Sequence, residues 1–314
     1  MWIQGLGMKN LGEILFRSTV GALSRLPLPV HYALCNIPAF LAEHVLCYRR
    51  LVVERNIENA FPDRTDKERR AIRHGFYRHF GEIIAETVWL GSCKAGDPRV
   101  AGFLSVENPE VLHEAWKGGQ SMMIMTSHAG NWELMGMLFD CDVDVPFTQA
   151  QVGEVYKKLK SPMWDRFMQE NRTTPLKGTG FQNLIESGDV LRFAVRHRNE
   201  QLMYVFPNDQ YPYKGAAFCE IGSFMNQPTR ALVGGAQLAS KLNMSVIYLG
   251  MRRDRRGHYT YVFDTICHHA AEMTAQSIME GFYERLQRDL EAQPENYLWS
   301  HKRWKQIENN YKKK

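Results

Sequence analysis

The chain has 314 residues, of which 44% are hydrophobic and 11% aromatic, and its formal net charge is +5. This length and composition support one large domain or two small ones with a sizeable core, and they exclude a disordered chain. The six cysteines are scattered without a CxxC pair, so the sequence suggests neither a disulfide framework nor a zinc cluster and fits a reducing compartment.

The first predicted element is an apolar segment at residues 26–42, in which no side chain is formally charged. Its length of about 17 residues is at the short limit for a membrane-spanning helix, and Pro27, Pro29 and Pro38 interrupt it. We therefore expect an apolar hairpin or interfacial segment that attaches the protein to a membrane without a conventional span. Three arginines follow at positions 49, 50 and 55, so we favour lipid headgroups over nucleic acid as partners of the basic residues. The alternative is a pair of buried core helices.

The rest of the chain predicts one α/β unit. Residues 65–68, Thr-Asp-Lys-Glu, form a capping box, and apolar side chains recur at helical spacing behind it, which predicts an amphipathic helix over residues 66–90. Short apolar runs predict strands at residues 121–126, 145–148, 202–206 and 245–250. Residues 258–266 are expected to return as a hairpin partner, and residues 278–290 to form a last amphipathic helix. The predicted fold is α/β, with a central mostly parallel or mixed sheet flanked by helices, and an attachment segment (residues 1–50) preceding one domain (residues 51–314).

The most informative motif joins His128 to Glu133. A predicted strand precedes His128, and Gly130 and Asn131 mark the bend into a helix. This context places His128 on a strand-to-helix loop and Glu133 in the first helical turn, where the carboxylate can lean back towards the imidazole. A histidine whose second ring nitrogen is held by a carboxylate is a competent general base near neutral pH. The alternative is a structural histidine near a helix start.

Motifs of several other site chemistries are missing from the sequence. It contains no GxSxG elbow, no GxxxxGK[ST] phosphate loop and no GxGxxG turn, which weakens the serine hydrolase, nucleotide hydrolase and dinucleotide interpretations. His268 and His269 lack further ligands at metal spacing, so we interpret them as a surface pair. We expect neither a metal nor a cofactor.

Four blocks of the sequence together carry a resemblance to a known family. They are the segment from Ser127 to Glu133, residues 55–62 (Arg-Asn-Ile-Glu-Asn-Ala-Phe-Pro), residues 207–210 (Pro-Asn-Asp-Gln) and residues 294–301 (Pro-Glu-Asn-Tyr-Leu-Trp-Ser-His). In these blocks and their order, the chain resembles the lipid A late acyltransferases, the lauroyl and myristoyl transferases related to the lysophospholipid acyltransferase superfamily. The resemblance implies an α/β fold attached to the cytoplasmic face of the inner membrane. It also implies transfer of a fatty acyl chain from acyl carrier protein, or from a coenzyme A thioester, to a hydroxyl of a glycolipid such as a lipid A precursor.

In such a reaction His128 would take the proton of the acceptor hydroxyl as that oxygen attacks the thioester, and Glu133 would orient the imidazole ring. The tetrahedral oxyanion needs hydrogen-bond donors, and we expect the backbone N–H groups of Gly130 and Asn131 to supply them. The alternative for these two residues is an ordinary loop-to-helix junction.

Anionic groups on the acceptor, such as phosphates, need cations. Lys157 lies in a block where the family commonly has an arginine, and Arg172 follows in the next predicted helix. A lysine offers a point charge rather than a bidentate fork, so the resemblance leaves the headgroup open. The alternative for both cations is a solvated helix face.

Two further pairs are expected near the site. Asp209 and Gln210 follow a predicted strand and should line the same cleft, or else form an ordinary strand-end turn. Thr229 and Arg230 follow a proline that is expected to open a helix close by. Other functions remain open at this point: acylation of another lysolipid or aminolipid, hydrolysis of an acyl thioester, or non-catalytic binding to a membrane surface.

Overall fold

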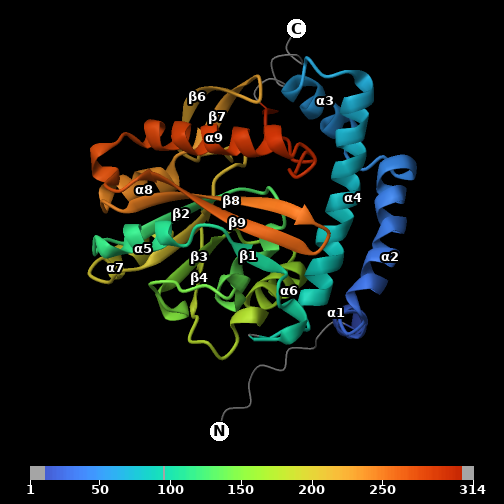
Figure 1. Cartoon of the computed structure of the whole chain (residues 1–314), viewed down its shortest axis with the longest axis horizontal. Helices are drawn as coiled ribbons and strands as arrows, with labels where there is room; N and C mark the ends of the chain where they lie inside the picture. Colours follow the sequence, from blue (N-terminus) through green and yellow to red (C-terminus); the bar gives the residue numbers. More distant parts are fainter. Residues whose placement is uncertain (1–10, 95, 306–314) are drawn as a thin grey trace.

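The core of the protein is a seven-stranded sheet with the strand order β1-β9-β8-β2-β5-β3-β4 (Figure 1). It is seen in a computed structural model that describes residues 11–94 and 96–305. The strands are β1 (Leu104–Val106), β2 (Met122–Thr126), β3 (Val152–Tyr156), β4 (Asn183–Glu186), β5 (Met203–Pro207), β8 (Ser245–Arg255) and β9 (His258–Cys267). Neighbouring strands pair in parallel except β8 and β9, which form an antiparallel hairpin. The expected α/β fold with a mostly parallel central sheet is confirmed.

Alternate residues of a strand point to opposite faces of the sheet. Both faces carry apolar side chains, and helices cover both. Met123 and Met125 of β2 pack in one buried cluster with α8 (Gly234–Lys241) and α9 (Ala275–Ala292). Met122 and Ile124 pack in a second cluster with α5 (Glu110–Lys117) and the 3₁₀ helix η3 (Trp132–Asp140). The other helices after residue 90 are η2 (Pro98–Val100), η4 (Gln149–Gln151), α6 (Pro162–Thr173), η5 (Thr174–Leu176), α7 (Val190–Arg196) and η6 (Ala270–Glu272).

The capping box at Thr65 opens α4 (Asp66–Leu90), and both bounds of this helix agree with the prediction. The Thr65 side chain accepts a hydrogen bond from the Glu68 N–H, while the Glu68 carboxylate accepts from the Thr65 N–H at 2.7 Å. Ile72 and Phe76 of α4 are buried in the first cluster. The helix α4 therefore joins the N-terminal helices to the sheet.

The N-terminal helices are α1 (Leu11–Leu23), α2 (Leu28–Phe40), the π-helix η1 (Leu41–Val45) and α3 (Arg50–Ala60), and α2 runs alongside α4 (Figure 1). The prolines interrupt this region less than expected. Pro27 is the N-cap of α2 and Pro29 lies in its first turn, where a missing N–H is tolerated. Pro38 lies inside α2, three residues before the π-helix begins.

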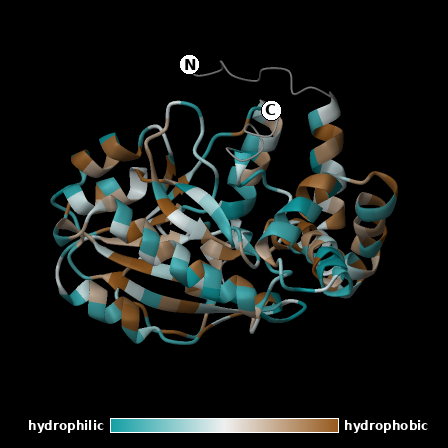
Figure 2. Cartoon of the chain, turned by 90° about the horizontal axis from the view of Figure 1, so that it is seen from above, coloured by the Kyte–Doolittle hydropathy of each residue, from teal (hydrophilic) through white to brown (hydrophobic). Residues whose placement is uncertain are grey.

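The outward face of these helices carries exposed apolar side chains, and Figure 2 shows the corresponding hydrophobic segments. On α2, for example, Leu34 is 48% exposed and Ile37 is 60% exposed. These fractions contradict the alternative of fully buried core helices. Within the described residues, no helix combines the length and the apolar character needed to cross a membrane.

Two predicted elements are wrong. Residues 145–148 form no strand, because Pro146 cannot donate to a sheet, and the strand of this region is β3. The helix expected after Pro228 is strand β7 (Gln227–Leu232), which pairs with β6 (Phe218–Phe224) as an antiparallel hairpin. Met225 and Asn226 both have positive φ, as a tight hairpin turn requires.

Candidate active site

The loop after β2 is the centre of the candidate site. The strand β2 lies between β5 and β8, so its carboxyl end opens at the middle of the sheet. Gly130 in this loop has φ +68°, and a Cβ there would lie 2.5 Å from the Met251 sulfur. The segment 296–298 holds the loop, since Leu298 N–H donates to the His128 carbonyl at 3.2 Å. His128 therefore lies on a loop with little freedom to move.

The carboxylate that contacts His128 belongs to Asp209, not to Glu133 as expected. His128 Nδ1 lies 2.7 Å from Asp209 Oδ1. Asp209 follows β5 by two residues, and β5 pairs in parallel with β2 so that Thr126 stands opposite Pro207. The carboxyl ends of two neighbouring strands thus bring the two side chains together.

This contact changes the acid–base properties of both groups. Burial alone would lower the pKa of His128, but the charge of Asp209 and its hydrogen bond outweigh that effect and raise it. Burial opposes ionisation of Asp209, yet the adjacent imidazole holds the pKa of this carboxyl below its usual range. Asp209 thereby stabilises the imidazolium that forms when His128 accepts a proton.

Glu133 instead forms a two-pronged ion pair with Arg172 of α6. The guanidinium Nε lies 2.7 Å from Glu133 Oε2, and the second contact is 2.9 Å. The Glu133 side chain is only 6% exposed, and a buried carboxylate requires such a partner. The charge of Glu133 still contributes to the raised pKa of His128, while that of Arg172 opposes it. Arg172 is therefore engaged by Glu133 and does not offer a free fork to a phosphate.

The backbone N–H groups expected to stabilise the oxyanion are both occupied. Gly130 N–H donates to the Asn296 carbonyl at 2.9 Å, and Asn131 N–H points to the Met251 sulfur at 2.9 Å. Both N–H groups are engaged because the loop is folded back on the segments that hold it, so neither points into open space in the structure. The Asn131 side chain caps η3 by accepting from the Glu133 N–H at 3.1 Å.

Gln210 lies at the second ring nitrogen of His128. Its Nε2 is 3.1 Å from His128 Nε2, where a neutral imidazole protonated at Nδ1 has its lone pair. The Trp132 ring packs against the imidazole with centroids 5.2 Å apart. Asp209 and Gln210 thus lie at the site, as expected, on opposite nitrogens of one ring.

Three expected binding residues lie elsewhere or stand apart. Thr229 accepts a hydrogen bond from the Trp304 indole at 2.8 Å, and Arg230 pairs with Glu220 of the β6–β7 hairpin. In the described part of the chain, neither makes a hydrogen bond or ion pair with His128. Lys157 follows β3 and is exposed, with its ammonium 4.0 Å from the centre of the Tyr213 ring.

Two residues of the C-terminal block contact the loops of the site, and neither was predicted from the sequence. His301 accepts from the Tyr211 N–H at 3.2 Å, and burial lowers its pKa to about 4, so it is neutral near pH 7. Tyr297 is buried and its backbone pairs with Ala129 of the loop. The resemblance of residues 294–301 to a family block was the signal that pointed here, although it assigned no role.

An apolar cavity lies beneath η3, which begins directly after the loop. Its lining includes Ile124, Met135, Phe139, Met203, Leu249 and Phe263. Glu154 of β3 is the charged member of this lining, and burial raises its pKa to about 7. The cavity is therefore suited to hydrocarbon rather than to a charged group.

A possible set of metal ligands among the described residues is Glu43, His44 and His74, whose ligand atoms lie within 4.8 Å of one another. Glu43 already accepts from Arg73 at 3.2 Å and contacts His74 Nδ1 at 2.8 Å. The carboxylate is thus satisfied by protein partners, and a cation would have to compete with the guanidinium. The cluster belongs to η1 and α4, not to the loop of His128.

Comparison with known proteins adds to this geometry. A family profile described as "Bacterial lipid A biosynthesis acyltransferase" matches residues 11–306. The chain is 23% identical over 262 residues to the lipid A biosynthesis acyltransferase of Haemophilus influenzae, covering 82% of this chain and 78% of that protein. It is 22% identical over 294 residues to the lipid A biosynthesis palmitoleoyltransferase of Escherichia coli, with coverages of 90% and 87%. With the lauroyltransferase of the same organism the identity is 21% over 309 residues, and the coverages are 97% and 92%.

Proposed function

The chain belongs to the bacterial lipid A biosynthesis acyltransferase family, and we propose that it transfers a fatty acyl chain from an acyl thioester to a hydroxyl of a lipid A precursor. Acyl carrier protein or coenzyme A carries the donor. The observation that carries this proposal is the His128–Asp209 pair, 2.7 Å apart at the carboxyl ends of two adjacent parallel strands. A base of this kind is what attack by an alcohol requires.

In the proposed reaction His128 is neutral. Its Nδ1–H group donates a hydrogen bond to Asp209, and its Nε2 faces the acceptor hydroxyl. His128 Nε2 takes the hydroxyl proton while the oxygen bonds to the thioester carbon. The tetrahedral intermediate then expels the thiolate, which receives the proton from the imidazolium. No covalent bond to the enzyme forms. Gln210, whose amide occupies Nε2 in the structure, gives way to the acceptor and is then placed to donate to the oxyanion.

The apolar cavity beneath η3 supports an acyl donor. Met135 and Phe139 of η3 line it, a few residues after Glu133. We propose that the acyl chain of the donor enters this apolar space from the side of His128 and displaces the side chains that fill it. Burial of a hydrocarbon there contributes about 0.8 kcal/mol for each CH₂ group.

We also propose attachment to the cytoplasmic face of the inner membrane through the N-terminal helices. Exposed apolar side chains on α2 and η1, such as Leu34, Ile37 and Val45, supply the hydrophobic contact. Arg50 and Arg55 follow them and supply charge for anionic headgroups. In this proposal the helices lie on the membrane surface.

The sequence suggested two cations, Lys157 and Arg172, as contacts for a phosphate of the acceptor. Because Arg172 is held by Glu133, exposed Lys157 remains as the proposed contact for a phosphate of the acceptor. Its ammonium stacks on Tyr213, a residue close in sequence to Gln210. We expect this contact to affect binding of the lipid rather than chemistry.

The proposal is tested with labelled acyl carrier protein, or acyl coenzyme A, and a panel of lipid acceptors, with products identified by mass. We expect acylated lipid from the wild type, and a loss of about 10²- to 10⁴-fold in the folded His128→Ala variant. Equal transfer by that variant would refute the mechanism. Release of free fatty acid without an acylated lipid would instead identify a thioester hydrolase.

A further inference from the structure

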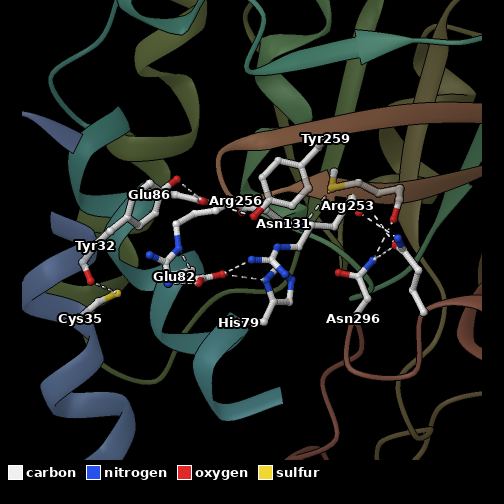
Figure 3. A network of polar contacts seen from close by, with 12 residues as sticks. Tyr32, Cys35, His79, Glu82, Glu86, Asn131, Arg253, Arg256, Tyr259 and Asn296 are labelled. Atoms are coloured by element: carbon white, nitrogen blue, oxygen red, sulfur yellow. Dashed lines mark hydrogen bonds and ion pairs between the residues drawn. The ribbon is translucent and has the colours of Figure 1, made fainter. Parts of the chain in front are cut away.

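A buried carboxylate on α4 contacts three different parts of the fold (Figure 3). Glu86 is 0% exposed. Its Oε1 accepts from the Tyr32 hydroxyl at 2.7 Å, and its Oε2 accepts from the Asn131 amide and the Tyr259 hydroxyl, each at 2.7 Å. All three donors are neutral. Among the described residues Glu86 makes no ion pair, because the arginines nearby, Arg253 and Arg256, bind Glu82 instead.

The contact with Asn131 fixes the orientation of an amide on the active-site loop. Glu86 Oε2 accepts from the NH₂ end of the Asn131 amide at 2.7 Å, so the carbonyl end of that amide points away from the carboxylate. That carbonyl oxygen accepts from the Glu133 N–H at 3.1 Å and caps η3. Through Asn131, Glu86 is thereby connected to the N-cap of η3, which begins at Trp132 directly after the loop of His128.

Among the described residues, Glu86 is the side chain of α4 that forms a hydrogen bond with the loop of His128. Asn131 is itself 0% exposed, so bulk water does not reach its amide and loss of the carboxylate removes a buried hydrogen bond. The third donor, Tyr259, lies on β9 and shares Oε2, and among the described residues it makes no hydrogen bond with the loop. Substitution of Tyr259 therefore changes the buried network without removing a hydrogen bond of the loop, whereas substitution of Asn131 changes the loop itself.

We propose that Glu86 is a positioning residue of the acyl transfer, which acts through Asn131 to hold the loop of His128 and the start of η3 in register. This inference rests on the proposed function. Glu86 does not touch His128 or the reacting atoms. Its effect is geometric, and displacement of catalytic groups by about 1 Å can lower a rate by about 10²-fold.

The same carboxylate links the loop to the helices proposed to contact the membrane. Tyr32 lies on α2, and its ring also packs under Arg256 with the guanidinium carbon 4.9 Å from the centroid. Glu86 Oε1 accepts a hydrogen bond from Tyr32 of α2, and Glu86 Oε2 accepts one from Asn131 of the loop. Seating of α2 and placement of Asn131 therefore depend on one side chain.

The test is a double-mutant cycle measured as kcat and KM for acyl transfer by the full chain. We expect Glu86→Ala and Asn131→Ala each to lower kcat at least tenfold and to change the KM of either substrate by less than about twofold. Because Glu86 acts through Asn131, the double variant should lose no more than Asn131→Ala alone. Tyr259→Phe, the matched control, removes a bond to the same oxygen and should leave kcat within about twofold. If Glu86→Ala does not fold, Glu86→Met fills the space without a polar atom and takes its place in the cycle.

A second measurement does not depend on activity. Hydrogen exchange of the Glu133 amide should accelerate in Glu86→Ala and Asn131→Ala but not in Tyr259→Phe, since only the first two release its acceptor. Losses that multiply in the double variant, or unchanged exchange at Glu133, would overturn the positioning role. Absence of transfer by the wild type would refute only the proposed function. The exchange measurement would still show whether Glu86 holds Asn131 in place.

Discussion

Replacement of Asp209 by asparagine separates the two carboxylates near His128. The His128–Asp209 contact is 2.7 Å long and Asp209 is 2% exposed. With charge centres about 4 Å apart and an effective dielectric constant of about 20, the ionised pair gains about 4 kcal/mol when the imidazolium forms. Loss of this stabilisation corresponds to a fall of about 10³-fold in kcat. The loss of activity in Asp209→Asn should therefore approach the loss expected for His128→Ala.

The decisive measurement is the pH dependence of kcat/KM. His128 must be neutral to accept a proton, so activity falls as pH drops through its raised pKa. Asp209→Asn removes the main cause of the raised pKa and should move this acid limb to lower pH. Glu133→Gln should move the limb less, because Glu133 acts on the ring only through space. A larger shift of the limb in Glu133→Gln than in Asp209→Asn, or nearly full activity of Asp209→Asn, would refute the role of Asp209.

Three other outcomes follow from the charges and exposed surfaces. Arg172→Met leaves the nearby carboxylate unneutralised and should move the acid limb of kcat/KM to higher pH, a shift opposite in sign to that of Asp209→Asn. Burial raises the pKa of Glu154 from 4.5 to about 7. The unfolded chain therefore ionises first as pH rises through this window, and the free energy of unfolding falls. Glu154→Gln should raise the free energy of unfolding at pH 8 by up to about 3 kcal/mol and change it little at pH 4, as thermal or urea unfolding would reveal. Leu34→Glu with Ile37→Glu should reduce co-sedimentation with anionic vesicles, whereas the control Leu191→Glu, on exposed α7, should not; equal binding by all three proteins would place the attachment elsewhere.

Local signals in the sequence were enough for the elements near the site. The capping box at Thr65 fixed the start of α4, because both of its hydrogen bonds involve residues three apart. The apolar run before His128 identified the central strand, since a strand buried on both faces is apolar throughout. The hairpin of β6 and β7 escaped prediction because its turn at Met225 and Asn226 has positive φ without a glycine.

The partner of His128 could not be obtained from spacing. Glu133 is five positions from His128 and Asp209 is 81 positions away, but strand pairing sets which side chains meet at the edge of a sheet. The parallel register of β2 and β5 places Thr126 opposite Pro207, and both polar residues follow two positions later. A sequence shows that Asp209 comes after a strand, whereas only the strand order shows that this strand lies beside β2.

The arrangement of two ion pairs explains why Glu133 can lie near a general base without disabling it. Asp209 touches the ring and raises the pKa of His128, and the charge of Glu133 acts in the same direction. If both carboxylates acted in full, the pKa of His128 would rise further and less of the imidazole would be neutral and able to accept a proton. Arg172 binds Glu133 through both of its oxygens and offsets its effect on the ring. The pairing of Glu133 with Arg172 therefore leaves Asp209 as the carboxylate that sets the strength of the base.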